Sequence, residues 1–191
     1  MKALRLSYST YDLMLIALMA GLGLAIKPVI VPLTHMVTGP LLIPGGSVAG
    51  GFYMMWLVLA GTLTGKFGAA FLTALVQALI VMISGSFGNH GAASIISYTV
   101  PGLAIELIWL ITRSRGQTLL SCFLAGMAAN ISGTYLSNLL FFRLPAIPLL
   151  FSLSIASLSG GLGGLIAWRL ACRIGKAQSK KRTDEQGDQT I

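Results

Sequence analysis

The stretch SIISYTVPGLAIELIW, residues 94–109, decides the fold, because it is apolar enough for a membrane span and yet contains Glu106. A carboxylate within a span costs about 3 kcal/mol even on lenient insertion scales, so it is a functional-site candidate by default. Four residues recur here at i, i+4, i+8 and i+11 and therefore share one helical face: Tyr98, Gly102, Glu106 and Trp109. We interpret this face as one wall of a ligand pocket.

The composition of the whole chain is that of an integral membrane protein. Of its 191 residues, 55% are hydrophobic and only 9% are charged. A soluble domain of this length carries about a quarter charged residues. The net charge of +8 comes from basic residues at the ends of apolar runs, which is a membrane-topology pattern rather than a footprint for nucleic acid.

Six apolar runs approach the roughly 20 residues that cross the hydrocarbon core. They lie at about 12–31, 46–63, 67–84, 92–112, 118–140 and 149–172. The predicted fold is an all-α six-transmembrane-helix bundle in one membrane domain, residues 1–175, with a polar cytoplasmic tail at 176–191. We expect an extended loop at 27–44, after prolines that end or kink the first helix, and no ordered structure in the tail.

The distribution of basic residues predicts the orientation. With six spans both termini lie on one side, together with eleven of the thirteen Lys and Arg residues; only Lys27 and Arg143 fall on the other side. The positive-inside rule then places both termini in the cytoplasm. We expect a multi-pass protein of a bacterial-type plasma membrane, with outer loops at 27–44, 85–91 and 143–148.

Two further spans carry aligned polar residues. Thr73, Gln77 and Ser84 share a face of the third span, and Asn130, Thr134 and Asn138 share a face of the fifth. Such groups can serve as interhelical hydrogen bonds, worth roughly 0.6 kcal/mol each. Together with the face of the fourth span they also fit three walls of a pocket, and both interpretations stay open.

Glu106 itself has two interpretations. It could face a cationic or donor-rich ligand, or it could be a structural anchor, protonated or paired with Arg113 or Lys66. It lies 14 residues after Ala92, which is roughly 20 Å along a helix. That depth is past the midplane toward the cytoplasm, so Glu106 forms either the floor of the site or a packing anchor.

Small residues recur every four positions on several spans. Ala17, Gly21 and Ala25 form such a ladder on the first span, and Gly160 and Gly164 repeat the spacing on the sixth. Small residues four apart let helices approach closely in lipid. Most of these pairs are explained by packing within the chain, but the first ladder could be a docking face for a partner subunit.

No catalytic set and no metal-binding pattern is recognisable. His35 and His90 have no cysteine or carboxylate beside them, and Cys122 and Cys172 do not have the spacing of metal ligands. We expect no enzymatic activity, no metal and no cofactor. Ligand contact or loop structure is the expected role of both histidines.

Glycine-rich motifs across residues 39–173 resemble the S components of energy-coupling factor (ECF) vitamin transporters, nearest the thiamine/hydroxymethylpyrimidine (YkoE-type) branch. The motifs are GKFGAA at 65–70, Gly85 and Gly88 after the third span, PGLAIE at 101–106 and LAGM at 124–127. The resemblance implies a non-catalytic, high-affinity substrate-binding subunit. It would work with a transmembrane coupling (T) component and two cytosolic ATPase subunits, which use the ATP.

The resemblance also implies site residues. Family pockets lie in the outer halves of spans four to six with the first and third outer loops, at positions that here hold His35, Asn89, His90, Tyr98, Asn130, Thr134 and Asn138. The family's docking helix carries alanines four apart, which matches Ala17, Gly21 and Ala25. A thiamine-like ligand would use Glu106 to balance its charge, whereas a cobalamin-like ligand would leave Glu106 structural.

A different class of function competes with this hypothesis. A stand-alone secondary transporter or channel subunit would use Glu106 as a proton or cation relay. Relays usually chain several ionisable groups, and Glu106 is the only acid deep within a span.

Overall fold

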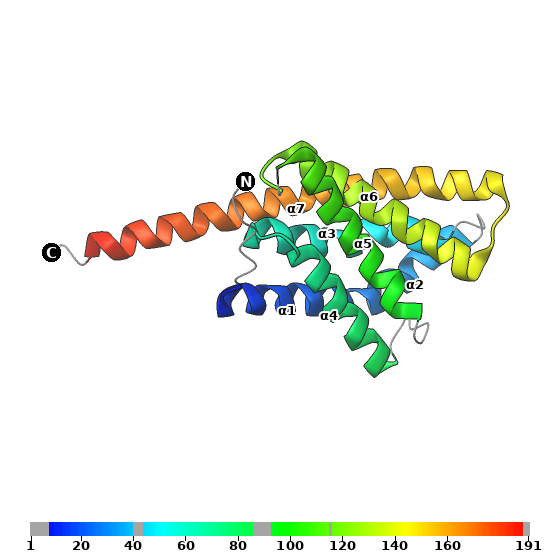
Figure 1. Ribbon diagram of the computed structural model, residues 1–191, viewed down its shortest axis with the longest axis horizontal. Helices are drawn as coiled ribbons and strands as arrows, with labels where there is room; N and C mark the ends of the chain where they lie inside the picture. Colours follow the sequence, from blue (N-terminus) through cyan, green and yellow to red (C-terminus); the bar gives the residue numbers. More distant parts are fainter. Residues whose placement is uncertain (1–7, 40–43, 86–92, 115, 189–191) are drawn as a thin grey trace.

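The computed structural model describes residues 8–39, 44–85, 93–114 and 116–188, with side chains as far as residue 175. In these residues the secondary structure is helical (Figure 1). The elements are α1 (Thr10–Ala25), α2 (Lys27–Thr38), α3 (Gly45–Thr64), α4 (Ala69–Ser84), α5 (Ala93–Thr112), α6 (Leu119–Ser137), the π-helix η2 (Asn138–Phe142) and α7 (Ala146–Asp188).

Five helical stretches are long and apolar enough to cross a membrane, and α4 is a shorter apolar helix. The first of the five joins α1 to α2, Thr10–Thr38. Helices α3 to α6 occupy nearly the same residues as the runs at 46–63, 67–84, 92–112 and 118–140. An all-α bundle of apolar helices is therefore confirmed.

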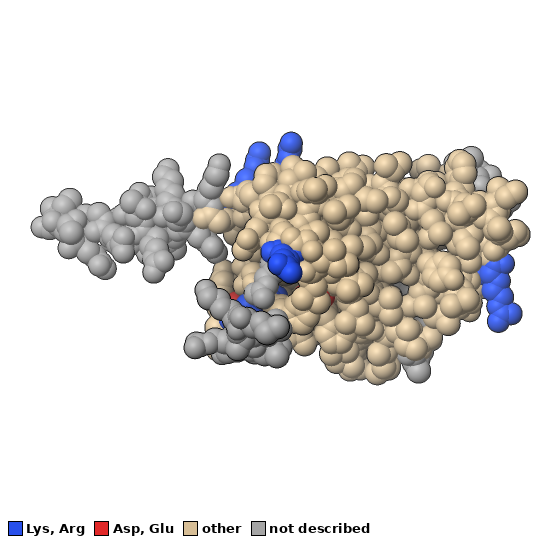
Figure 2. Space-filling model, turned by 45° about the horizontal axis from the view of Figure 1, so that its top comes forward, with Lys and Arg blue, Asp and Glu red and all other residues tan. Residues whose placement is uncertain are grey.

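Helix α3 contacts most of the other helices, namely α1, α2, α4, α5, α6 and α7. Helix α5 packs between α4 and α6, and α1 begins on the side where α7 leaves the bundle (Figure 1). The outer surface is apolar, with exposed side chains such as Leu107 and Phe151. On the face in Figure 2, one blue basic group lies at the right-hand end and the others lie over the left half, and the surface between them is tan.

Two expectations about irregular segments are wrong. Residues 27–38 form helix α2 rather than an extended loop. Pro28 is tolerated in the first turn, where its missing N–H would have no partner, and Pro32 is accommodated inside the helix. Likewise α7 continues through 176–188 of the polar tail, because a packed helix can be extended by good helix formers without a new nucleation step.

The crossing of α6 and α7 depends on glycine. A Cβ atom on Gly160 would lie 2.3 Å from the carbonyl oxygen of Gly126, and one on Gly164 would lie 2.1 Å from that of Cys122. Real Cβ atoms do not approach a carbonyl so closely. The spacing of Gly160 and Gly164 therefore serves packing within the chain, as most of the small-residue pairs were expected to do.

Candidate functional site

One cavity of about 160 Å³ lies where α3 and α7 begin and α6 ends. Its wall combines aromatic rings, hydroxyl groups, side-chain amides and one lysine. A few polar groups in a mostly apolar cavity are typical of a small-molecule site. The polar and aromatic lining residues are Lys27, Ser47, Tyr53, Gln77, Ser97, Tyr98, Asn130, Thr134, Ser137, Asn138, Phe142 and Ser152.

Four of the expected substrate-binding residues line this cavity: Tyr98, Asn130, Thr134 and Asn138. They come from α5, α6 and η2, which are the stripes of the fourth and fifth spans. Gln77 brings the third stripe to the same cavity. One residue of the third span's stripe, one of the fourth's and all three of the fifth's therefore lie at one cavity.

The other expected residues have different surroundings. His35 is exposed on α2 and lies against Gly45, and the cavity wall does not include it. Asn89 and His90 fall outside the described residues.

The two asparagines shape the cavity wall through their own hydrogen bonds. The Asn130 amide donates to the carbonyl oxygens of Ser47, at 3.1 Å, and Ala156, at 2.9 Å, which ties α6 to α3 and α7. The Oδ1 atom of Asn138 accepts from the backbone N–H of Leu144 at 2.8 Å. This bond closes the turn after η2, and π-helical turns of this kind occur often at functional sites.

Lys27 is a cavity residue that the sequence interpretation did not assign to the site. Its Nζ atom donates to the Tyr98 hydroxyl at 2.5 Å and lies 3.9 Å from the centroid of the Tyr98 ring. It also lies 5.2 Å from the centroid of the Tyr53 ring. Both distances are within the range of cation–π attraction. The sequence signal for this role is a basic residue within a long apolar stretch, a pattern that membrane topology also explains.

Glu106 lies in the second half of α5, near the start of α4 and away from the residues that line the cavity. It is only 4% exposed, and its Oε1 atom accepts from the backbone N–H of Ala70 at 2.9 Å. Ala70 is in the first turn of α4, whose N–H groups have no partner within the helix. A carboxylate there also interacts favourably with the helix dipole. This geometry agrees with the structural-anchor interpretation.

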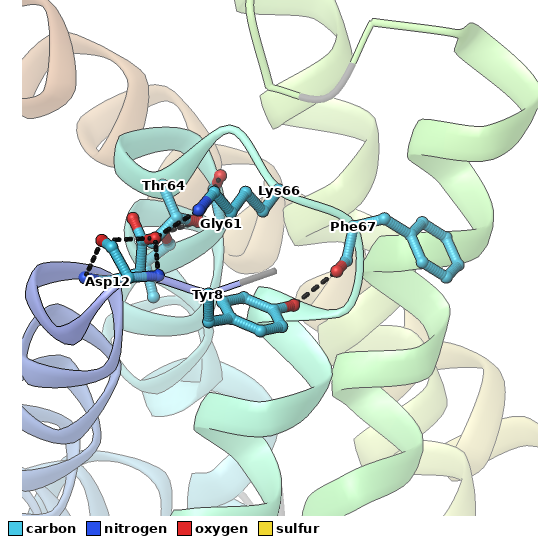
Figure 3. A network of polar contacts seen from close by, with 8 residues as sticks. Tyr8, Asp12, Gly61, Thr64, Lys66 and Phe67 are labelled. Atoms are coloured by element: carbon cyan, nitrogen blue, oxygen red, sulfur yellow. Dashed lines mark hydrogen bonds and ion pairs between the residues drawn. The ribbon is translucent and has the colours of Figure 1, made fainter. Parts of the chain in front are cut away.

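A polar cluster joins the start of α1 to the segment between α3 and α4 (Figure 3). Asp12 caps α1 with Ser9 and forms an ion pair with Lys66, at 2.5 Å. The Tyr8 hydroxyl donates to the carbonyl oxygen of Phe67. Burial raises the pKa of Tyr8, and the negative charges of Glu106 and Asp12 raise it further. Lys66 therefore pairs with the acid at the entry to the first span.

The ladder on α1 is free of packing within the described part of the chain. Ala17, Gly21 and Ala25 are all exposed, and a Cβ atom on Gly21 would meet nothing within 4 Å. Ala20 and Gly23, on the other side of the helix, are buried. Unlike Gly160, the ladder lies open on the surface of the bundle.

The fold defines a class: small polytopic membrane proteins built as a bundle of apolar helices. Within that class, a family model described as "ABC-type cobalt transport system, permease component" matches residues 11–132, and the chain belongs to this family.

A solved structure described as "Crystal structure of an S-component of ECF transporter" shares the fold, with a TM-score of 0.76 and 21% identity. The match covers 95% of this chain and 98% of that chain. Comparison with curated proteins gives no match.

Proposed function

We propose that the chain is the substrate-binding S component of an ECF-type importer for a small vitamin or vitamin precursor. The carrying observation is the cavity of about 160 Å³, lined by polar residues from three predicted spans, in a chain that has the fold of an S component. The termini lie in the cytoplasm, and the cavity opens toward the outside. The chain binds the substrate, and partner ATPases supply the energy.

Within this proposal, the lining of the cavity favours a hydroxymethylpyrimidine-like ligand. The wall contains a lysine and, among the described lining residues, no carboxylate. The lysine favours a neutral pyrimidine over the cationic thiamine, because Glu106 on α5 does not line the cavity and so does not balance a positive charge there.

The family description names cobalt, which raises a free cobalt ion as another substrate. Such an ion is held by imidazole, thiolate or carboxylate ligands. The described lining residues offer hydroxyl, amide and aromatic groups instead, which suit an organic molecule. We therefore assign the cavity to an organic ligand.

We propose that the ladder on α1 docks the transmembrane coupling component, which in turn binds two cytosolic ATPases. Supporting this role, Ala17, Gly21 and Ala25 are exposed and contribute no close helix crossing within the described bundle. Small residues allow a partner helix to approach the α1 backbone in lipid.

The test is identification of the ligand that co-purifies with the chain. The protein is purified in mild detergent, the bound small molecules are extracted, and mass spectrometry determines their identity and their amount per chain. We expect about one equivalent of a single-ring organic compound. A protein that carries no small molecule, and binds none of a panel of vitamins in titration calorimetry, contradicts the proposal.

A further inference from the structure

Lys27 lies in an environment that is unusual for a lysine in a membrane helix bundle. Its ammonium group carries three N–H donors, and the bond to the Tyr98 hydroxyl, at 2.5 Å, uses one of them. The rings of Tyr98 and Tyr53 lie 3.9 Å and 5.2 Å from Nζ. These contacts hold the ammonium at the cavity wall instead of letting it extend to the membrane surface, as a lysine near a helix end usually does.

Tyr53 adds a second donor at the same place. Its hydroxyl group is buried and has no hydrogen-bond partner among the described residues. Tyr53 lines the cavity with Lys27 and Tyr98. Buried polar groups are nearly always hydrogen-bonded, and leaving one unsatisfied costs about 1–3 kcal/mol. A ligand in the cavity that accepts from this hydroxyl would remove the penalty.

The charge of the cavity wall also favours a ligand that accepts hydrogen bonds. The described lining residues include one cation, Lys27, and no carboxylate. Burying an ammonium group without an opposite charge or strong acceptors is costly. The Lys27 ammonium donates to the Tyr98 hydroxyl, and among the described residues it forms no hydrogen bond to the side chain of Asn130 or Asn138.

We propose that Lys27 and Tyr53 are the specificity-determining pair of the cavity. Both donate to an acceptor edge of the ligand, either ring nitrogens or a carboxylate, while the Tyr98 ring holds the ammonium in position. The site therefore selects a small ring compound that is neutral or anionic and disfavours a permanent cation. This inference rests on the proposed binding function and assigns the class of its substrate.

The experiment measures the affinity of three probes of different charge by titration calorimetry on ligand-free protein in detergent. The probes are 4-amino-5-hydroxymethyl-2-methylpyrimidine, which is neutral, nicotinate, which is anionic, and thiamine, which carries the same pyrimidine on a cation. We expect the wild-type chain to prefer the pyrimidine over thiamine by about tenfold or more, since like charges disfavour each other at close range.

Three variants separate recognition from a structural role. Lys27→Met is expected to lower the affinity for the pyrimidine by about tenfold or more, because it removes a charged donor. The affinity for thiamine should fall less or rise, so the preference for the pyrimidine over thiamine becomes smaller. Lys27→Arg keeps the charge and should preserve this preference. Tyr53→Phe should lower the affinity for the pyrimidine. The preference for the neutral probe over the cationic probe should remain, because Lys27 is still present.

Lys66→Met is the matched control, because Lys66 pairs with Asp12 outside the cavity. It should leave all three affinities unchanged. A wild-type preference for thiamine, or a Lys27→Met variant that weakens every probe equally, overturns the inference. Wild-type protein that binds none of the three probes also overturns the inference about Lys27 and Tyr53. The proposed binding function still stands in that case if an organic ligand co-purifies with the chain. Absence of any ligand contradicts the proposed function itself.

Discussion

Lys27 and Glu106 are two charged side chains within apolar helices, and their surroundings differ. Lys27 lines the cavity with two tyrosines. Glu106 accepts a hydrogen bond from the first turn of α4. Ionisable groups in a membrane helix mark either a functional site or a structural pairing. The contacts of Lys27 indicate a functional site, and those of Glu106 indicate a structural pairing.

Replacement of Glu106 tests its structural role. Glu106→Leu leaves the Ala70 N–H without its acceptor, so we expect a loss of about 1–3 kcal/mol in the free energy of unfolding. Glu106→Gln keeps an acceptor oxygen and should lose less. Thermal unfolding monitored in detergent measures both changes.

The ligand affinity of the same variants provides the contrast. We expect Glu106→Gln to bind the co-purifying ligand as the wild-type chain does, because Glu106 does not line the cavity. A large loss of affinity in a folded Glu106→Gln protein would instead place the carboxylate in the binding site or in a relay.

At the scale of elements, two sets of small residues with the same spacing have different surroundings. Gly160 and Gly164 let α7 cross α6 with their backbones in contact. The ladder Ala17, Gly21 and Ala25 is exposed on α1. Spacing alone could not separate packing within the chain from a docking face, because close approach to any helix requires the same small residues.

Gly160→Ala tests the crossing of α6 and α7. The added Cβ atom would lie 2.3 Å from the Gly126 carbonyl oxygen, so the helices must separate, and we expect a loss of about 1–3 kcal/mol in stability. Gly21→Ala is the matched control and should not lower stability, since no atom lies within 4 Å of its Cβ position. Equal losses in the two variants would contradict the assignment.

Gly21→Leu tests the docking face. The leucine fits on the open surface, so the purified variant should fold and bind ligand normally. Its affinity for the transmembrane coupling component should fall by about tenfold or more, as for a central interface residue. Co-purification of tagged coupling component with the wild-type chain and the variant measures the effect. Undiminished association would assign docking to another surface.

At the scale of the whole molecule, the apolar runs predicted helices α3 to α6 closely, because twenty apolar residues have few alternatives in lipid. The stripe of the fifth span lines the cavity in full, whereas the third and fourth spans contribute only Gln77 and Tyr98 from their stripes. The sequence did not predict α2, because Pro28 and Pro32 suggested a loop. It also did not reveal Lys27 or Tyr53 as cavity residues, because their approach to Tyr98 depends on how three helices pack.

The orientation of the molecule can be tested with its own cysteines. Cys172 is exposed on α7, near Arg169 and Arg173, whereas Cys122 is buried. The positive-inside rule predicts that the Cys172 end lies in the cytoplasm. A membrane-impermeant maleimide should therefore label inside-out vesicles and spare right-side-out vesicles, as read by mass spectrometry. Cys172→Ser should abolish the labelling, and labelling of right-side-out vesicles would reverse the topology.

Transport in sealed vesicles tests the central claim most directly. The chain is reconstituted alone or with its coupling component and two ATPases, and uptake of the co-purifying ligand is measured with and without ATP. We predict uptake only with the complete assembly and ATP, and only ligand binding by the chain alone. Uptake by the chain alone in ATP-free vesicles would contradict the account and would make the protein a stand-alone transporter.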